Sequence, residues 1–264
     1  MSNYDMERER PAAPRVVVVG LASCFGCQLQ VTNAEPYLLD VLGQIDLRYW
    51  QLTSSDPMPD DFDVAVIEGA ATTKEAVDTL KRVRKVAKKV IAIGSCATTA
   101  GIPGMAATGL GSHVASVYGD AGAPEACGDM IDPAPISDFI DVDFEVLCCP
   151  IDTFAFIDVL QCAIYGSNRL PQTSTLCGEC KYNDRGCFFG RGVLCLGLVT
   201  RSGCGARCTD LGRPCNGCAG LSPDANVASA RKACERAGVS VRAFDEALTL
   251  FNQVNPAICA ENEG

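Results

Sequence analysis

The fold of this chain is decided by RVVVVGLASCFGCQLQ, residues 15–30. The stretch opens with a short, continuous run rich in valine, which is typical of a parallel strand buried on both faces. Two cysteines separated by two residues, Cys24 and Cys27, follow in the loop that we expect after this strand. In open α/β sheets, ligands bind beyond the carboxyl ends of the strands. The sequence therefore predicts a binding site at this pair.

The same alternation of apolar runs and amphipathic stretches continues over the first 170 residues. It predicts strands over 15–21, 46–52, 63–68, 90–94 and 143–149, and helices over 28–43, 72–89 and 152–166. Residues 101–135 are rich in Gly, Ala and Pro, so we expect a long loop there. Alternating strands and helices predict an α/β fold with a doubly wound parallel sheet.

Composition divides the chain into three parts. Residues 1–14 are charged with mixed sign and are interpreted as an N-terminal extension, and residues 15–170 as the α/β domain. After Leu170 and Pro171 the composition shifts to a cysteine-rich segment. Residues 171–264 are therefore predicted to form a C-terminal domain, which closes with helices over 223–238 and 241–252.

Two more cysteines follow predicted strands. Cys96 comes after the run at 90–94, and Cys149 ends the run at 143–149. With Cys24 and Cys27 they supply four thiolates from three loops at one edge of the sheet, which suits one metal cluster. Buried free cysteine, a common core residue, is the alternative interpretation.

The densest cysteine pattern is CGECKYNDRGCFFGRGVLCLGLVTRSGCGARCTDLGRPCNGC, residues 177–218, which holds eight of the chain's 17 cysteines. Eight thiolates suit two four-ligand centres, and soft thiolates select iron–sulfur clusters or zinc. Only the outer pairs have the two-residue gap usual in zinc ribbons, so the spacing favours iron–sulfur. It leaves open which four residues serve which centre. The eight are Cys177, Cys180, Cys187, Cys195, Cys204, Cys208, Cys215 and Cys218.

The overall charge and the scarcity of histidine exclude several function classes. A net charge of −10 argues against nucleic acid as a partner, because phosphate binding needs a basic surface. With His113 as the single histidine, histidine-based catalysis and Cys2His2 zinc sites are nearly excluded. The sequence shows no signal-peptide pattern and no apolar run near 18 residues, so we expect a cytoplasmic protein without a membrane span.

Motifs along nearly the whole chain resemble the small subunit of nickel–iron hydrogenases. The resemblance is carried by LASCFGCQLQ at 21–30, IEGAATT at 67–73, AIGSCATTAGIP at 92–103 and LCCPID at 147–152. CGECKYNDRGC at 177–187, GVLCLGLVTRSGCGARC at 192–208 and GRPCNGC at 212–218 are similar to the cytosolic, cofactor-coupled branch, which includes sulfhydrogenase delta and methanogen hydrogenase gamma subunits.

The resemblance implies a flavodoxin-like domain, a ferredoxin-like region and three 4Fe-4S clusters. The proximal ligands would be Cys24, Cys27, Cys96 and Cys149, and the eight C-terminal cysteines would hold the medial and distal clusters. The family has Gly-Cys-Pro-Pro where this chain has Cys148, Cys149, Pro150 and Ile151, and there the cysteine before proline is the ligand. Cys149 is therefore chosen over Cys148.

The implied role is electron transfer, with no bond chemistry in this chain. A separate large subunit would hold the nickel–iron centre that splits hydrogen. A flavin- or iron–sulfur-containing diaphorase or electron-transfer subunit would then receive the electrons. The sequence leaves the electron acceptor open, with NADP, NAD, a deazaflavin, ferredoxin and a heterodisulfide-reducing partner as candidates.

Glu68 is the one carboxylate singled out, because it ends a predicted strand and precedes Gly69. A backbone cap or solvent-facing strand end is one interpretation, and a role beside the proximal cluster or in proton handling is the other. Two other functions stay open for the chain as a whole. It could be a complex I-like iron–sulfur subunit without hydrogenase activity, or a zinc-stabilised interaction module.

Overall fold

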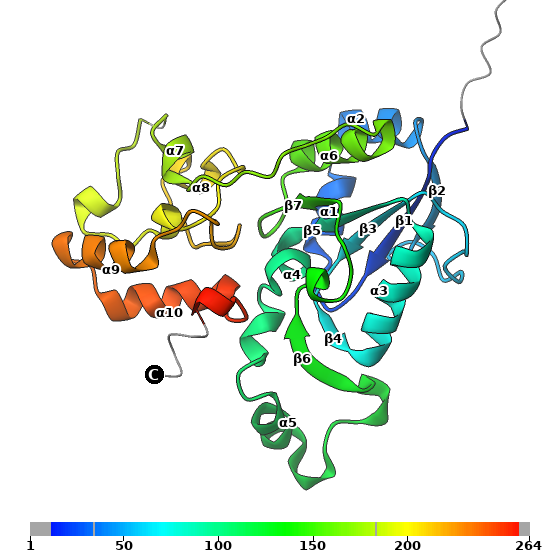
Figure 1. Ribbon diagram of the computed structural model, residues 1–264, viewed down its shortest axis with the longest axis horizontal. Coiled ribbons are helices and arrows are strands. Elements are labelled where there is room, and N and C mark those ends of the chain that lie inside the picture. Colours follow the sequence, from blue (N-terminus) through cyan, green and yellow to red (C-terminus); the bar gives the residue numbers. More distant parts are fainter. Residues whose placement is uncertain (1–11, 34, 183, 259–264) are drawn as a thin grey trace, which may run out of the picture.

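The computed structural model describes residues 12–33, 35–182 and 184–258. An α/β region and a cysteine-rich C-terminal region lie side by side, joined by the segment after α6 (Figure 1). Five strands form one parallel sheet in the order β2-β1-β3-β5-β7. They are β1 (Arg15–Gly20), β2 (Asp46–Trp50), β3 (Val64–Glu68), β5 (Lys89–Ile93) and β7 (Phe144–Val146).

This strand order identifies the fold and its binding edge. Numbered among themselves along the chain, the five strands run 2-1-3-4-5, which is the flavodoxin-like order. The order reverses between β1 and β3, and ligands in such sheets bind beyond the carboxyl ends at that point. All five predicted strands and the parallel sheet are confirmed.

Helices cover both faces of the sheet, as alternation along the strands requires. On one face, Val17 and Ile67 pack with Leu80 of α3. On the other, Val18 and Ile93 pack with α6. Each such fully buried aliphatic side chain contributes about 1.5–3 kcal/mol. The helices of this region are α1 (Gly26–Thr32), α2 (Glu35–Leu42), α3 (Lys74–Val86), α4 (Gly94–Thr99) and α6 (Thr153–Tyr165).

The long loop expected over 101–135 is wrong. The segment contains η1 (Pro103–Ala106), α5 (Leu110–Tyr118) and β6 (Met130–Ala134), and β6 pairs antiparallel with β4 (Ala71–Thr73). β6 includes Asp132 and Pro133, residue types depleted in strands, and it pairs only with this short strand. No residue of α5 is buried, although Leu110, Val114, Val117 and Tyr118 recur at helical spacing. The Gly- and Pro-rich sequence around this short pattern favoured the loop interpretation.

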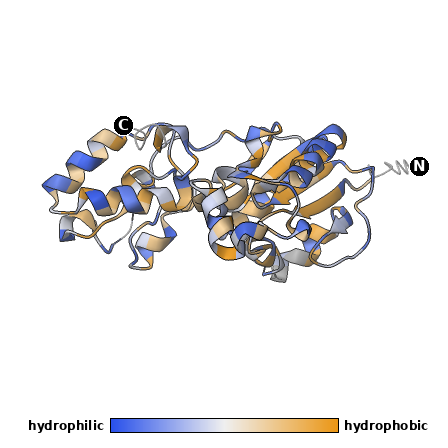
Figure 2. Cartoon of the chain, turned by 90° about the horizontal axis from the view of Figure 1, so that it is seen from below, coloured by the Kyte–Doolittle hydropathy of each residue, from blue (hydrophilic) through white to orange (hydrophobic). Residues whose placement is uncertain are grey.

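The cysteine-rich loops of the C-terminal region rest on its last two helices. Leu196 and Val199 pack with Phe244 and Leu248 of α10 and with Cys234 of α9, which is fully buried. In Figure 2 these helices alternate between hydrophilic and hydrophobic residues, whereas the strands of the sheet are mostly hydrophobic. The elements are α7 (Cys177–Cys180), η5 (Phe189–Arg191), η6 (Leu196–Leu198), α8 (Arg207–Asp210), α9 (Val227–Arg236) and α10 (Val241–Asn252).

Polar contacts join the two regions at the carboxyl end of the sheet. Arg201 forms an ion pair of 2.9 Å with Glu145 of β7, and Arg207 one of 3.2 Å with Asp152, which caps α6. The hydroxyl of Ser95 also donates a hydrogen bond to the backbone carbonyl of Cys218. Across the described residues, no helix combines the length and the apolar character that a membrane crossing requires.

Candidate metal centres

Four cysteines gather beyond the carboxyl ends of β1, β5 and β7. Burial is the main cause that raises the pKa of Cys27, and nearby charges on Glu68, Cys149 and Cys96 raise it further. Burial, followed by Cys149 and Cys24, raises the pKa of Cys96 to about 11. The structure therefore brings Cys24, Cys27, Cys96 and Cys149 into one electrostatic group at the edge expected from the sequence.

Glu68 belongs to this group and also caps a helix. Its carboxylate is only 1% exposed. It accepts hydrogen bonds from the backbone N–H groups of Cys27, at 3.1 Å, and Gln28, at 3.3 Å. These are the second and third N–H groups of α1, whose N-cap residue Phe25 makes no side-chain cap. Glu68 therefore caps α1 and also lies beside the proximal cysteines.

Gly94 shapes the space around the Cys27 sulfur. Its φ of +80° lies in the left-handed region, which side chains rarely adopt. A Cβ atom built at this position would overlap the sulfur of Cys27. Glycine at this turn is what lets α4, which carries Cys96, approach α1.

The first four cysteines of the C-terminal segment line a single cavity. Cys177, Cys180, Cys187 and Cys195 surround about 630 Å³, together with apolar residues that include Leu176, Phe188 and Phe189. Burial, followed by Cys195, Cys180 and Cys187, raises the pKa of Cys177 to about 11. A mainly apolar cavity lined by four thiols suits a cluster with soft ligands.

The last four cysteines lie between the two groups already described. Cys218 interacts electrostatically with Cys149 of the proximal group and with Cys208. On the other side, the backbone N–H of Cys215 donates to the sulfur of Cys195 at 3.3 Å. The order along the molecule is therefore the strand-end group, then Cys204, Cys208, Cys215 and Cys218, then the first four of the segment.

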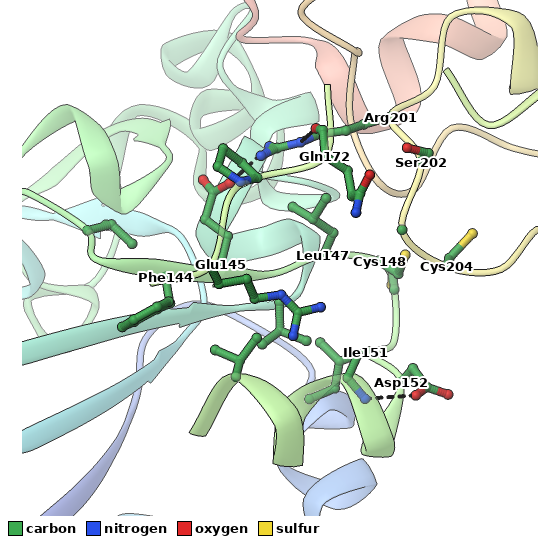
Figure 3. A pocket seen from close by; sticks show the side chains of 18 of the residues that line it. Phe144, Glu145, Leu147, Cys148, Ile151, Asp152, Gln172, Arg201, Ser202 and Cys204 are labelled. Atoms are coloured by element: carbon green, nitrogen blue, oxygen red, sulfur yellow. Dashed lines mark hydrogen bonds and ion pairs between the residues drawn. The ribbon is translucent and has the colours of Figure 1, made fainter. Parts of the chain in front are cut away.

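Cys148 is a fifth thiol at this middle group, and together with Cys204 it lines a cavity of about 710 Å³ between the two regions (Figure 3). Its thiol interacts with those of Cys204 and Cys218, and this interaction is the main cause that raises the pKa of Cys148. The same interaction lowers the pKa of Cys204 and of Cys218.

Backbone N–H groups lie near sulfurs in all three groups. Gly217 donates to Cys215 at 3.4 Å, and the backbone groups of Ile151 and Gly197 act against the burial that raises the pKa of Cys27 and of Cys195. Hydrogen bonds of this kind stabilise thiolates and adjust cluster potentials. The donor set therefore fits iron–sulfur clusters.

A single-ion site does not fit the same cysteines. In the described part of the chain, no three His, Cys, Asp or Glu side chains converge in a way that would hold one metal ion. Zinc needs four ligands around one point. The four cysteine sulfurs around a four-iron cluster each bind a different iron, so they stand further apart than the four ligands of one zinc ion.

The sequence interpretation missed the position of Cys148. The one available signal was that cysteine stands there in place of the glycine of the resembled motif. The other cysteines outside the twelve predicted ligands lie elsewhere. Cys127 is exposed, Cys162 is partly buried in α6, and Cys234 is buried in the C-terminal core. Cys259 falls outside the described residues.

Comparison with known proteins identifies the family. Residues 24–163 match the family described as NADH ubiquinone oxidoreductase, 20 Kd subunit. This match covers the α/β region and ends before the cysteine-rich segment.

Two relatives extend the similarity into the cysteine-rich segment. Sulfhydrogenase 2 subunit delta of Pyrococcus furiosus is 31% identical over 80% of this chain and 87% of its own length. One of the subunits of the vhu F420-non-reducing hydrogenase of Methanocaldococcus jannaschii is 29% identical over 91% of this chain and 94% of its own length.

A solved structure agrees on the fold. The crystal structure of an NAD⁺-reducing [NiFe]-hydrogenase in the H₂-reduced state contains a chain with a TM-score of 0.54 and 22% identity. The similarity covers 60% of this chain and 95% of that one. The protein thus belongs to the family of the 20 kDa subunit of NADH–ubiquinone oxidoreductase, and within it to the small subunits of nickel–iron hydrogenases.

Proposed function

We propose that this chain relays electrons between the large-subunit active site and a redox partner through three 4Fe-4S clusters. The observation that carries the proposal is the succession of three adjacent groups of four cysteines, in which the first interacts electrostatically with the second and the second is hydrogen-bonded to the third. Each cluster, when bound, accepts and releases one electron at a time. Cys24, Cys27, Cys96 and Cys149 would hold the proximal cluster.

The contacts also support a division of the eight remaining ligands. Cys177, Cys180, Cys187 and Cys195 share one cavity, so we assign them to the distal cluster. Cys204, Cys208, Cys215 and Cys218 lie between that cavity and the proximal group and are assigned to the medial cluster. The protein's own part is to hold the sulfurs, exclude water and direct N–H groups at them.

The large subunit is expected to dock beside the proximal cysteines. Leu29 of α1 is 52% exposed, and Phe154 of α6 is 62% exposed. Phe154 makes an edge-to-face contact of 5.6 Å with Tyr37 of α2. Large exposed apolar side chains on neighbouring helices are typical of a protein interface. An interface on this face would bury Cys24, which is exposed in the isolated chain.

At the other end, we propose a diaphorase or electron-transfer subunit, with a flavin or iron–sulfur group, that presents an acidic surface. Residues 177–218 carry six Lys or Arg and three Asp or Glu, a net charge of +3 in a chain of −10. Arg191 stacks 4.3 Å from the ring centroid of Phe188, which lines the distal cavity, and Arg236 lines it too. The surface around the distal cavity is therefore basic, although the chain as a whole is acidic.

The proposed location is the cytoplasm. The described cysteines are all free, and a site built from twelve thiolates requires reduced thiols, which the cytoplasm maintains.

Single serine substitutions in the complex with the large subunit test the relay and the division of ligands. Cys187→Ser should remove or convert the distal cluster and Cys208→Ser the medial one, and each should change a different electron paramagnetic resonance signal. Cys162→Ser, in α6, is the matched control and should leave iron content unchanged. If both ligand variants altered the same signal, the assignment of the two groups would be wrong.

A complex I-like role is the second candidate, because the family match carries that description. It requires one cluster on the α/β region and no nickel-bearing partner. Copurification of the chain without a nickel-containing subunit, with iron for one cluster only, would favour it.

A further inference from the structure

Glu179 joins the segments that carry the distal and the medial ligands. It lies in α7, the short helix that begins at Cys177 and ends at Cys180, between two cysteines assigned to the distal cluster. Its Oε1 atom accepts a hydrogen bond of 2.8 Å from the backbone N–H of Gly203. Gly203 directly precedes Cys204, which is assigned to the medial cluster. The Glu179 carboxylate is therefore located between the two groups of ligands.

Backbone hydrogen bonds hold the same two segments side by side. The N–H of Leu176 donates to the carbonyl of Thr200 at 2.8 Å, and the N–H of Ser202 donates to the carbonyl of Ser174 at 3.0 Å. The hydroxyls of the two serines also lie 2.9 Å apart, within hydrogen-bond distance. These bonds form a short antiparallel bridge next to α7. The segments should therefore stay together when the side chain of Glu179 is changed.

The second oxygen of the Glu179 carboxylate has no evident structural purpose. Oε2 is buried, and within the described ranges of the chain it has no hydrogen-bond partner. A buried carboxylate oxygen without a donor is costly, because burial removes the water that would stabilise it. A hydrogen bond to Gly203 needs only one acceptor oxygen, which a neutral glutamine would also supply. Such unpaired groups call for another explanation, and a redox role is one.

We propose that the Glu179 carboxylate places a negative charge between the medial and distal clusters and thereby makes the reduction potentials of both clusters more negative. The inference rests on the proposed function, which places a cluster on each side of this residue. Reduction adds one electron to a cluster, and no bond forms or breaks at Glu179. A fixed negative charge nearby disfavours that electron. Clusters with more negative potentials are stronger electron donors, so the charge favours transfer to the redox partner.

The test is a redox titration of the complex with the large subunit, followed by electron paramagnetic resonance, for wild type, Glu179→Gln and Glu179→Asp. Glutamine keeps an acceptor for the Gly203 N–H but removes the charge. Both C-terminal signals should then titrate at more positive potentials, at unchanged iron content, while the proximal signal stays where it is. Aspartate keeps the charge, so both potentials should lie closer to wild type than those of the glutamine variant.

Glu246→Gln is the matched control. The side chain of Glu246 is 63% exposed and pairs with Arg242 on the surface of α10, where water screens its charge. The same loss of one negative charge in the same region should therefore leave all three potentials unchanged. An equal shift in this variant would mean that the effect of Glu179 reflects net charge and not its position.

Two further results would overturn the inference. Unchanged medial and distal potentials in Glu179→Gln would mean that the carboxylate charge does not act on the clusters. Loss of about four irons per chain in that variant, the content of one cluster, would mean that Glu179 holds the ligand segments in place and does not tune them. Failure of the proposed function is distinguishable, because wild type would then lack iron for three clusters before any substitution is made.

Discussion

Gly94 illustrates how single positions determine whether the proximal group can form. The residue has a positive φ, and any side chain there would meet the Cys27 sulfur. The backbone at Gly94 cannot shift to accommodate a side chain, because Gly94 is the first residue of α4 and directly follows the buried strand β5.

Gly94→Ala should therefore lower iron by about four per chain, the content of one cluster. Gly111→Ala is the control, because a Cβ at that position of α5 meets nothing within 4 Å. Iron and sulfide analysis of both purified variants gives the answer. An alanine variant at position 94 with full iron content would show that the turn tolerates a side chain.

Glu68 places a buried negative charge beside three proximal cysteines while it caps α1. Glu68→Gln keeps one acceptor oxygen but removes the charge. The proximal potential should rise by tens of millivolts, since a charge interaction of about 1 kcal/mol corresponds to roughly 40 mV for one electron. Redox titration measures the shift.

Hydrogen turnover in the same variant tests the proton-handling hypothesis separately. Full turnover with a shifted proximal potential would mean that Glu68 does not handle protons. Its role would then be to cap α1 and to place a charge near the cluster. An unaltered potential would show that the carboxylate does not influence the proximal group at all.

At the scale of elements, the sheet holds the strand ends in register, and Asp63 ties two strands together. Its carboxylate accepts hydrogen bonds of 3.0 Å from the backbone and side chain of Arg15 at the start of β1. These bonds hold the pKa of Asp63 well below its usual value. The ionised form is therefore favoured by folding, and its contribution is full above the unfolded pKa of about 3.9.

Asp63→Asn should cost about 1–3 kcal/mol of unfolding free energy at pH 7, the usual contribution of hydrogen bonds to a charged group. The deficit should shrink as the pH falls below about 4, because wild type then loses the same contribution. Denaturant unfolding of the isolated chain, followed by its single tryptophan, Trp50, measures this.

Asp46→Asn serves as the control for that comparison, because Asp46 pairs with Arg48 on the surface and exposed pairs contribute little. A deficit at position 63 that does not depend on pH would contradict the role given to the ion pair.

The elements that the sequence revealed are those with a strong local pattern. Runs of Val and Ile marked β1, β3 and β5, and the amphipathic pattern marked α3. By contrast, α5 is a short helix within a Gly- and Pro-rich segment and β6 carries Asp and Pro, so neither has a strong local pattern.

The positions of the candidate-site cysteines could likewise be predicted only in part. Strand ends predicted the meeting of Cys24, Cys27, Cys96 and Cys149, because the carboxyl ends of parallel strands share one edge. The division of the eight C-terminal cysteines could not be predicted, since it depends on how irregular loops fold over α9 and α10. The positive φ of Cys148 was equally hidden, because no local sequence pattern indicates it.

Considered as a whole molecule, the chain carries net charge of opposite sign in the cysteine-rich segment and in the rest of the sequence. The cysteine-rich segment carries +3, whereas the other residues together carry 16 basic and 29 acidic side chains. Surface charges steer an oppositely charged partner, and salt screens the effect with a Debye length of about 10 Å at 0.1 M.

Electron delivery from the complex to an acidic ferredoxin, used as a probe, should accordingly slow as ionic strength rises. Arg191→Glu should lower the second-order rate several-fold at low salt. Arg48→Glu, on β2 at the far edge of the sheet, is the control and should have little effect (Figure 1). Equal rates for both variants would mean that electrons do not leave through this charged surface.

The most direct test of the electron relay is the metal content of the native complex purified without oxygen. Three four-iron clusters predict about twelve irons and about twelve sulfides per copy of this chain, with nickel in a copurifying subunit. About four irons and no nickel-bearing partner would contradict the relay and favour the complex I-like role. Zinc with little iron would contradict electron transfer by this chain altogether.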